Sequence, residues 1–188
     1  YHTGLVGKWM IEGLANIPVE VEIASEYRYK KTFYNNETLV IVVSQSGETA
    51  DTLASLRKAN QDHIDTLAIV NVTTSTIARE AKYLLPVKAG SEIAVATTKA
   101  YLAQLAMFSL IAFKMAKEKN LLSEEDIQKL TDYYQQLPGQ IEKLLKQLNL
   151  KDLAQKIYSK EDIFFLGRGI DNAIGMEASL KLKEISYI

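Results

Sequence analysis

Hydroxyl side chains crowd a short loop, Ser44-Gln45-Ser46-Gly47-Glu48-Thr49, that follows a run of apolar residues. In an open α/β sheet, ligands bind beyond the carboxyl ends of the strands, where the N-terminus of the next helix offers free N–H groups to an anion. A glycine lets the backbone approach such a ligand closely. No lysine follows Gly47 as in a Walker A loop, so the pattern favours a sugar phosphate over a nucleotide triphosphate. The alternative is a Ser/Thr helix cap without a ligand.

A second candidate site lies on the predicted last helix, Asp171–Tyr187. At about 100° per residue, Glu177, Lys181 and Glu184 fall on the same side of this helix as its apolar residues. Ionisable groups on a buried face are costly unless paired, and their pKa values are readily shifted. A carboxylate beside an amine in such a place is suited to general-base or imine chemistry. A buried structural ion pair, Glu177–Lys181 or Lys181–Glu184, fits the same spacing.

Other motifs carry weaker signals. Gly167-Arg168-Gly169 also follows an apolar run, but a dinucleotide-binding fingerprint needs a third glycine where Asn172 stands. We therefore interpret the glycine pair as a tight strand-to-helix turn. Of the two histidines, we expect His63 on a solvated loop, and His2 either beside the site or in a structural role.

The hydrophobic pattern predicts the elements that must position these residues. The unbroken β-branched run Leu39–Val43 is typical of a parallel strand covered on both faces, and the apolar runs Leu67–Val70 and Tyr83–Val87 predict two further strands. The alternating segment Pro18–Ile23 predicts a further, half-exposed strand. Helical segments separate the later strands, and such alternation indicates an α/β fold with right-handed crossovers.

The second half of the chain is predicted to be mostly helical. An apolar helix over Val95–Lys117 is expected to be buried or to form an oligomer interface, and Pro138 is expected to start a separate helix. The segment Asp162–Gly169 repeats the strand-then-glycine pattern. We therefore predict a first domain over residues 1–150, and the first strand and helix of a second, similar domain over residues 151–188.

Composition excludes several classes of function. The 22 Lys+Arg and 23 Asp+Glu residues give a net charge of −1, which argues against nucleic-acid or anionic-membrane partners. The absence of cysteine excludes a disulfide scaffold, a cysteine-ligated zinc site and thiol catalysis, and two histidines leave too little for a histidine-rich metal site. The longest apolar helical stretch is too short to cross a bilayer. We predict a soluble, cytoplasmic domain that handles a small molecule.

Several segments together resemble a known family. Ser44–Leu53 is similar to the phosphosugar-binding loop of the sugar isomerase (SIS) family. Further segments, in the expected order, resemble the isomerase half of the glutamine–fructose-6-phosphate aminotransferases: Ala24–Tyr29, Ile77–Glu80, Ala89–Ala100, Leu166–Gly169 and Glu177–Ile188. The similarity spans essentially the whole chain. It implies a three-layer αβα fold with a flavodoxin-like parallel sheet, with the first strand missing because it would precede Tyr1.

The resemblance also implies a reaction and a role for each part of the site. The family converts fructose 6-phosphate and ammonia, released from glutamine by a separate glutaminase domain, into glucosamine 6-phosphate without a metal or organic cofactor. By position, the phosphate would be held by side chains of the loop: Ser44, Gln45, Ser46 and Thr49. The backbone around Val95, together with Thr97, would contact the sugar. Glu184 would be the base that moves a proton between C1 and C2, with Lys181 beside it.

Partners follow from the same resemblance. It implies a homodimer with a site shared between subunits, a glutaminase domain in the parent chain, and neither nucleic acid nor membrane. The family's ring-opening histidine and imine-forming terminal lysine would follow Ile188, so the 188 residues alone are expected to be inactive. The alternatives are another SIS-fold phosphosugar isomerase or deglycase, and a non-catalytic sugar-phosphate sensor, which needs the loop but not Glu184.

Overall fold

The centre of the fold is a parallel sheet, in a computed structural model that describes residues 1–35, 37–94 and 96–187. In these residues the sheet has the order β1 (Leu39–Ser44), β2 (Asp65–Val70) and β3 (Tyr83–Pro86). Ser44 pairs with Val70, and Val70 pairs with Pro86, so the three strands end at the same edge. The three predicted strands and the α/β fold class are confirmed.

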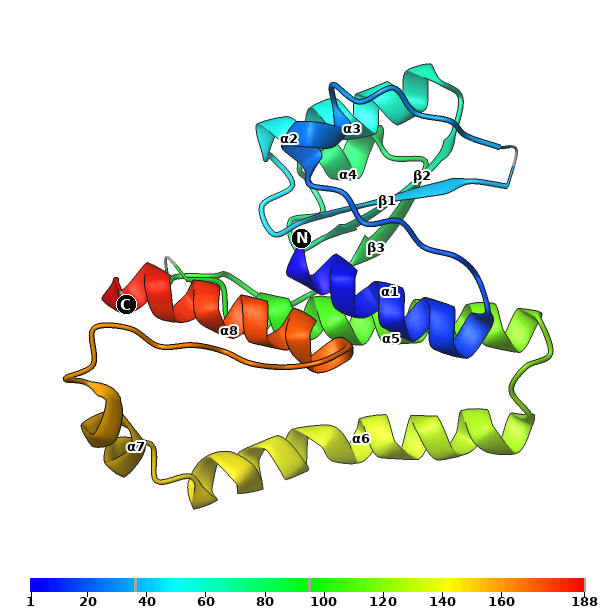
Figure 1. The fold of residues 1–188 in the computed structure, drawn as a ribbon. Coiled ribbons are helices and arrows are strands. Elements are labelled where there is room, and N and C mark those ends of the chain that lie inside the picture. Colours follow the sequence, from blue (N-terminus) through cyan, green and yellow to red (C-terminus); the bar gives the residue numbers. More distant parts are fainter. Residues whose placement is uncertain (36, 95, 188) are drawn as a thin grey trace.

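Helices cover both faces of this sheet, as Figure 1 shows. They are α3 (Ala50–Gln61) and α4 (Thr76–Glu80) on one face, and α1 (His2–Ala15) and α5 (Lys99–Glu118) on the other. Successive side chains of a strand point to opposite faces. Accordingly, Ala68 and Val70 of β2 pack against α3 and α4, whereas Ile69 packs against α1 and α5. The three-layer αβα arrangement is therefore confirmed.

A glycine sets how closely α1 crosses α5. A Cβ built on Gly7 would lie 2.4 Å from Cδ1 of Phe108, a ring buried in the core between these helices and the sheet. We expect Gly7→Ala to lower the free energy of unfolding by about 1–3 kcal/mol, because the ring has to leave its place. Urea denaturation measures this. Gly13→Ala is the control, because a Cβ there meets nothing within 4 Å, and equal losses in both variants would contradict the packing argument.

The predicted strand at Pro18–Ile23 is wrong. This segment is extended but pairs with no strand of the described sheet, and it leads into the short helix α2 (Ala24–Tyr27). Its backbone is occupied elsewhere, because the Val19 N–H donates to the Glu12 carboxylate of α1 at 3.0 Å. The side chains of Ile17 and Val19 join the core beneath α1 and α5. The alternating pattern therefore reflects packing along a helix.

Pro138 does not start a helix, contrary to the prediction. It lies inside α6 (Glu124–Gln147), which begins with a capping box between Ser123 and Asp126. A proline inside a helix removes one backbone hydrogen bond. Most residues around Pro138 are exposed, so water can solvate the freed carbonyl group, and the long helix continues. The short helix α7 (Leu150–Ile157), which the sequence analysis did not predict, follows and is capped by Asn149.

The last helix, α8 (Ile170–Ser186), is close to its predicted bounds and packs against α1. The preceding strand, predicted over Asp162–Leu166, is not formed: the segment is extended, and no described strand pairs with it. Phe164 and Leu166 are 85% and 92% exposed. The division into domains 1–150 and 151–188 stays a prediction. Among the described residues, no helix is both long and apolar enough to cross a membrane.

Candidate functional site

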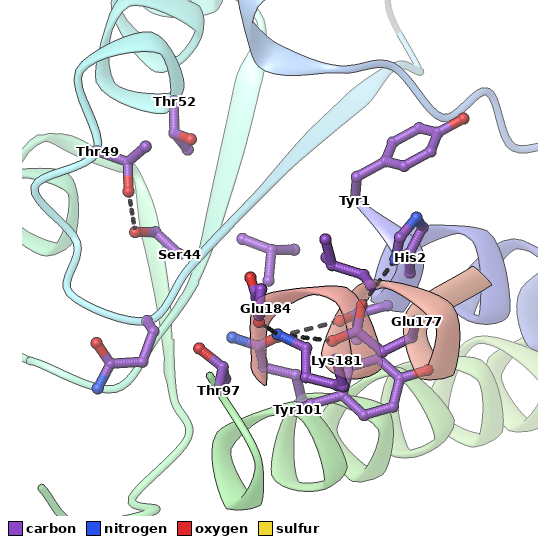
Figure 2. Close-up of a pocket in the computed structure, with 15 residues that line it drawn as sticks. Tyr1, His2, Ser44, Thr49, Thr52, Thr97, Tyr101, Glu177, Lys181 and Glu184 are labelled. Atoms are coloured by element: carbon purple, nitrogen blue, oxygen red, sulfur yellow. Dashed lines mark hydrogen bonds and ion pairs between the residues drawn. The ribbon is translucent and has the colours of Figure 1, made fainter. Parts of the chain in front are cut away.

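A cavity of about 400 Å³ lies where β1 ends, between the sheet and α8 (Figure 2). Its walls come from the first residues of α1, the end of β1 with the start of α3, the start of α5, and one side of α8. These segments are distant in the sequence and meet only in the folded chain. The cavity therefore brings both candidate sites of the sequence analysis together.

The hydroxyl loop forms one wall of the cavity and is held in a tight conformation. Ser44 is 6% exposed, and its Oγ accepts a hydrogen bond from the Gly47 N–H at 3.0 Å and lies 2.9 Å from Oγ1 of Thr49. Gly47 has a φ of +69°, and a Cβ built on it would lie 1.9 Å from Oγ of Ser75. This position therefore requires glycine.

The N-terminus of α3 is available to an anion. Within the described residues, no side chain caps this helix: the hydroxyl of its N-cap residue Thr49 faces Ser44 instead. Ser75 and Ser123, in contrast, cap α4 and α6 with their own side chains. Uncapped N–H groups at the start of a helix bind phosphate groups readily.

The acidic residues beside the loop are bound elsewhere. Asp51, in the first turn of α3, accepts from Arg28 at 2.7 Å, which offsets a charge that would otherwise repel an anion. The Glu48 carboxylate accepts the Thr76 N–H at 2.6 Å, and this backbone hydrogen bond lowers the pKa of Glu48. Both contacts leave the start of α3 free to bind an anion.

The opposite wall carries three charged side chains of α8 (Figure 2). Nζ of Lys181 lies 2.5 Å from Oε2 of Glu184 and 3.5 Å from Oε1 of Glu177. The side chain of Lys181 is 22% exposed, that of Glu184 34% and that of Glu177 13%. Burial by itself would lower the pKa of Lys181, but the hydrogen bond to Glu184 and the charge of Glu177 together raise it. Lys181 is therefore an ammonium ion that lies between two carboxylates.

The structure brings most of the predicted site residues together. Five line the cavity along with Thr49: Ser44, Gln45, Thr97, Lys181 and Glu184. Ser46 is exposed, and its Oγ accepts the Glu48 N–H at 3.2 Å within the loop rather than facing the cavity. Val95 lies outside the described residues. The roles assigned to all these residues stay predictions.

Further lining residues were not among the predicted site residues. Two of them, Tyr101 and Gln104, belong to α5. Gln104 accepts a hydrogen bond from the Thr3 hydroxyl at 3.1 Å. The Tyr101 hydroxyl is buried and has no hydrogen-bond partner among the described residues, and burial together with the charge of Glu177 raises its pKa. In the sequence, the feature that points to these lining residues is Gln104 itself, because it is a large polar side chain within an otherwise apolar helix. Among the described residues, no group of three or more His, Asp or Glu is placed to hold a metal ion.

Comparison with known proteins identifies the class. The sequence profile of the SIS domain family matches residues 1–114, and the chain belongs to this family. It is 52% identical to a glutamine–fructose-6-phosphate aminotransferase (isomerizing) of Clostridium tetani and 49% identical to that of Clostridium perfringens. In both comparisons the whole chain is covered, and it spans 31% of the relative's length.

A solved structure agrees with these relatives. The C-terminal domain of glucosamine-fructose-6-phosphate aminotransferase from Francisella tularensis superposes with a TM-score of 0.95 at 40% sequence identity. The match covers all of this chain and 54% of that one. The chain thus has the fold of part of that C-terminal domain.

Proposed function

We propose that this chain is the phosphosugar-binding isomerase part of a glutamine–fructose-6-phosphate aminotransferase, which converts fructose 6-phosphate and ammonia into glucosamine 6-phosphate. One observation carries the proposal: a single cavity has an uncapped helix N-terminus with hydroxyl groups on one wall and the Glu177–Lys181–Glu184 cluster on the other. A phosphosugar needs an anion site and, at the other end of the molecule, a proton-transfer site. The names of the 43–52% identical relatives support the choice of substrate.

In this proposal, each wall of the cavity acts on one end of the sugar. The phosphate binds the first-turn N–H groups of α3 beside Ser44 and Thr49. Ammonia condenses with the C2 carbonyl to give the C2 imine, and the C2 oxygen leaves as water. Glu184 takes a proton from C1 of this imine and returns it to C2, while the O1 hydroxyl loses its proton and the nitrogen gains one, which gives the 2-amino aldose. The Lys181 ammonium, with Nζ 2.5 Å from Oε2 of Glu184, places a positive charge directly beside this carboxylate.

The partners follow from the same proposal. The parent polypeptide carries a glutaminase domain that supplies ammonia, and it works in the cytoplasm as a homodimer. Leu102 and Leu110, on the exposed side of α5, support the dimer because large apolar side chains there gain from being covered. Analytical ultracentrifugation of the complete isomerase half tests it: a dimer is expected, and a monomer at high concentration would contradict this part of the proposal.

Ser44→Ala tests the anion site. The variant removes the acceptor of the Gly47 N–H and the neighbour of the Thr49 hydroxyl. We expect the affinity for fructose 6-phosphate to fall about tenfold, because one or two polar contacts that shape the loop are lost. Calorimetry measures this, with Ser25→Ala as the control, since the Ser25 hydroxyl donates to the neighbouring Glu26 carboxylate on the surface. Unchanged affinity in Ser44→Ala would contradict the proposal that the phosphate binds at this loop.

A non-catalytic sugar-phosphate sensor is the alternative of another class. It would use the α3 wall and leave the α8 cluster without a chemical role. The partly buried ion contacts of Lys181 favour a catalytic site. Removing three charged groups from water costs free energy, and a protein that only binds a phosphate would not need them in the cavity wall. A sensor would bind fructose 6-phosphate and show no turnover in the complete protein. Another SIS-fold isomerase or deglycase would turn over a different phosphosugar.

A further inference from the structure

His2, at the start of α1, reaches across to the charged cluster of α8 (Figure 2). Its Nδ1 lies 2.7 Å from Oε2 of Glu177, and the two side chains are only 15% and 13% exposed. The other oxygen of Glu177 faces Lys181, which contacts Glu184. The contacts therefore form a continuous series, His2–Glu177–Lys181–Glu184, that joins two helices at the cavity wall.

The contact between His2 and Glu177 defines which ring nitrogen carries hydrogen. An ionised carboxylate only accepts hydrogen bonds, so Nδ1 of His2 carries a proton and donates to Glu177. This holds for the neutral ring as well as for the charged one. A histidine in this place can therefore hold the Glu177 carboxylate without changing its own charge.

The unequal distances around Lys181 indicate what this contact does. An ammonium between two carboxylates can move toward either one, and here it lies 2.5 Å from Glu184 but 3.5 Å from Glu177. The Glu177 carboxylate also accepts a hydrogen bond from His2, so Lys181 is not its only donor. Without His2, the nearly buried Glu177 carboxylate would draw the ammonium toward itself, because an unpaired buried charge is costly.

Given the proposed role of Glu184 as the base, we propose that His2 is a positioning residue: it holds Glu177 and thereby keeps Lys181 against Glu184. His2 does not itself touch the reacting atoms in this scheme. It acts through two intervening side chains, in the way that a third group orients an acid–base pair.

The groups around Glu184 make the effect measurable as a change in pH dependence. The titratable side chains that face the cavity are Tyr1 and His2 from α1 and its N-cap, Tyr101 from α5, and Glu177 and Lys181 from α8. The end of β1 and the start of α3 contribute uncharged side chains such as Ser44 and Thr49. Lys181 is the single lysine or arginine among the described lining residues. Moving it away takes the nearest positive charge from the proposed base, so we expect activity to be lost at a higher pH on the acidic side.

The test uses the longer polypeptide that the proposed function implies, assayed for glucosamine 6-phosphate formation. We expect His2→Ala to lower kcat roughly tenfold to a hundredfold, because the base and its cation lose their alignment. The KM for fructose 6-phosphate should change little, because the phosphate wall is untouched. The acidic limb of the pH profile of kcat should move to higher pH.

Two conservative variants separate positioning from general structural support. The side-chain nitrogen of asparagine can occupy the place of Nδ1, whereas that of glutamine corresponds to Nε2. We therefore expect His2→Asn to recover most of kcat and the normal acidic limb, and His2→Gln to behave like His2→Ala. Lys8→Ala, which removes an exposed ion pair of the same helix with Glu12, is the control and should match the unmodified protein.

The outcomes distinguish this inference from the function on which it rests. If Glu184→Gln retains turnover, the proposed function fails. If Glu184→Gln is inactive but His2→Ala keeps kcat and the acidic limb, the role of His2 is overturned and the proposed function stands. If His2→Ala does not fold, equal kcat values in His2→Asn and His2→Gln, whether high or low, overturn the role of His2.

Discussion

Glu184→Gln is expected to lower isomerisation by about 10²–10⁴-fold, the usual contribution of a positioned general base, while fructose 6-phosphate still binds. The amide keeps the shape of the side chain but cannot take a proton from C1. Binding persists because the proposed phosphate contacts lie on the other wall of the cavity, at the start of α3. Formation of glucosamine 6-phosphate by the longer polypeptide gives the turnover, and calorimetry gives the affinity.

The control for this variant is Glu142→Gln on α6. Glu142 also forms an ion pair with a lysine one turn away, Lys146 at 2.6 Å, but it is exposed and far from the cavity. Its replacement should change neither turnover nor binding, since exposed pairs of this kind contribute little. Normal turnover in Glu184→Gln would contradict the assignment of Glu184 as the base. Loss of binding together with turnover would place the phosphate near α8 instead of α3.

Gly47→Ala is expected to be the most damaging change in the loop. Its Cβ would lie 1.9 Å from Oγ and 2.5 Å from Cβ of Ser75, and the backbone φ of +69° is unfavourable for alanine. Ser75 is buried and caps α4, and the Gly47 carbonyl accepts the Ile77 N–H at 3.1 Å, so the loop and the start of α4 would have to move together. We expect the free energy of unfolding to fall by about 2–4 kcal/mol. The affinity for fructose 6-phosphate should fall more than tenfold.

Gly139→Ala in α6 gives the matched control. A Cβ at Gly139 meets nothing within 4 Å, and its backbone is helical, so alanine should stabilise the helix by about 0.5–1 kcal/mol. Urea denaturation and phosphosugar titration of both variants make the comparison. A Gly47→Ala protein as stable as the unmodified one, with normal affinity, would show that the tight loop conformation is dispensable.

The sequence predicted the sheet and the α8 cluster because both depend on local periodicity. The β-branched run of β1 and the apolar run of β2 form strands with both faces covered, as such runs do. The spacing of Glu177, Lys181 and Glu184 determined that they share one side of a helix, and they line one wall of the cavity. The position of the hydroxyl loop after β1 followed from the rule that ligands bind at the carboxyl ends of parallel strands.

The errors arose where a local pattern had a non-local cause. In the alternating segment Pro18–Ile23, Val19 packs against the core beneath α1 and α5, and its N–H donates to the Glu12 carboxylate, seven positions away, instead of to a neighbouring strand. The prediction of a helix start at Pro138 is wrong because the exposed helix α6 tolerates a proline in its interior. The contact of His2 with Glu177 joins residues 175 positions apart, so no spacing rule could predict it.

The most direct test of the central claim is a crystal structure of the longer polypeptide with fructose 6-phosphate bound. We expect the phosphate against the first-turn N–H groups of α3, within hydrogen-bond distance of the Ser44 or Thr49 hydroxyl, and the Glu184 carboxylate in contact with C1 and C2 of the sugar. A phosphate bound away from α3, or a sugar whose C1 and C2 lie out of reach of Glu184, would contradict it.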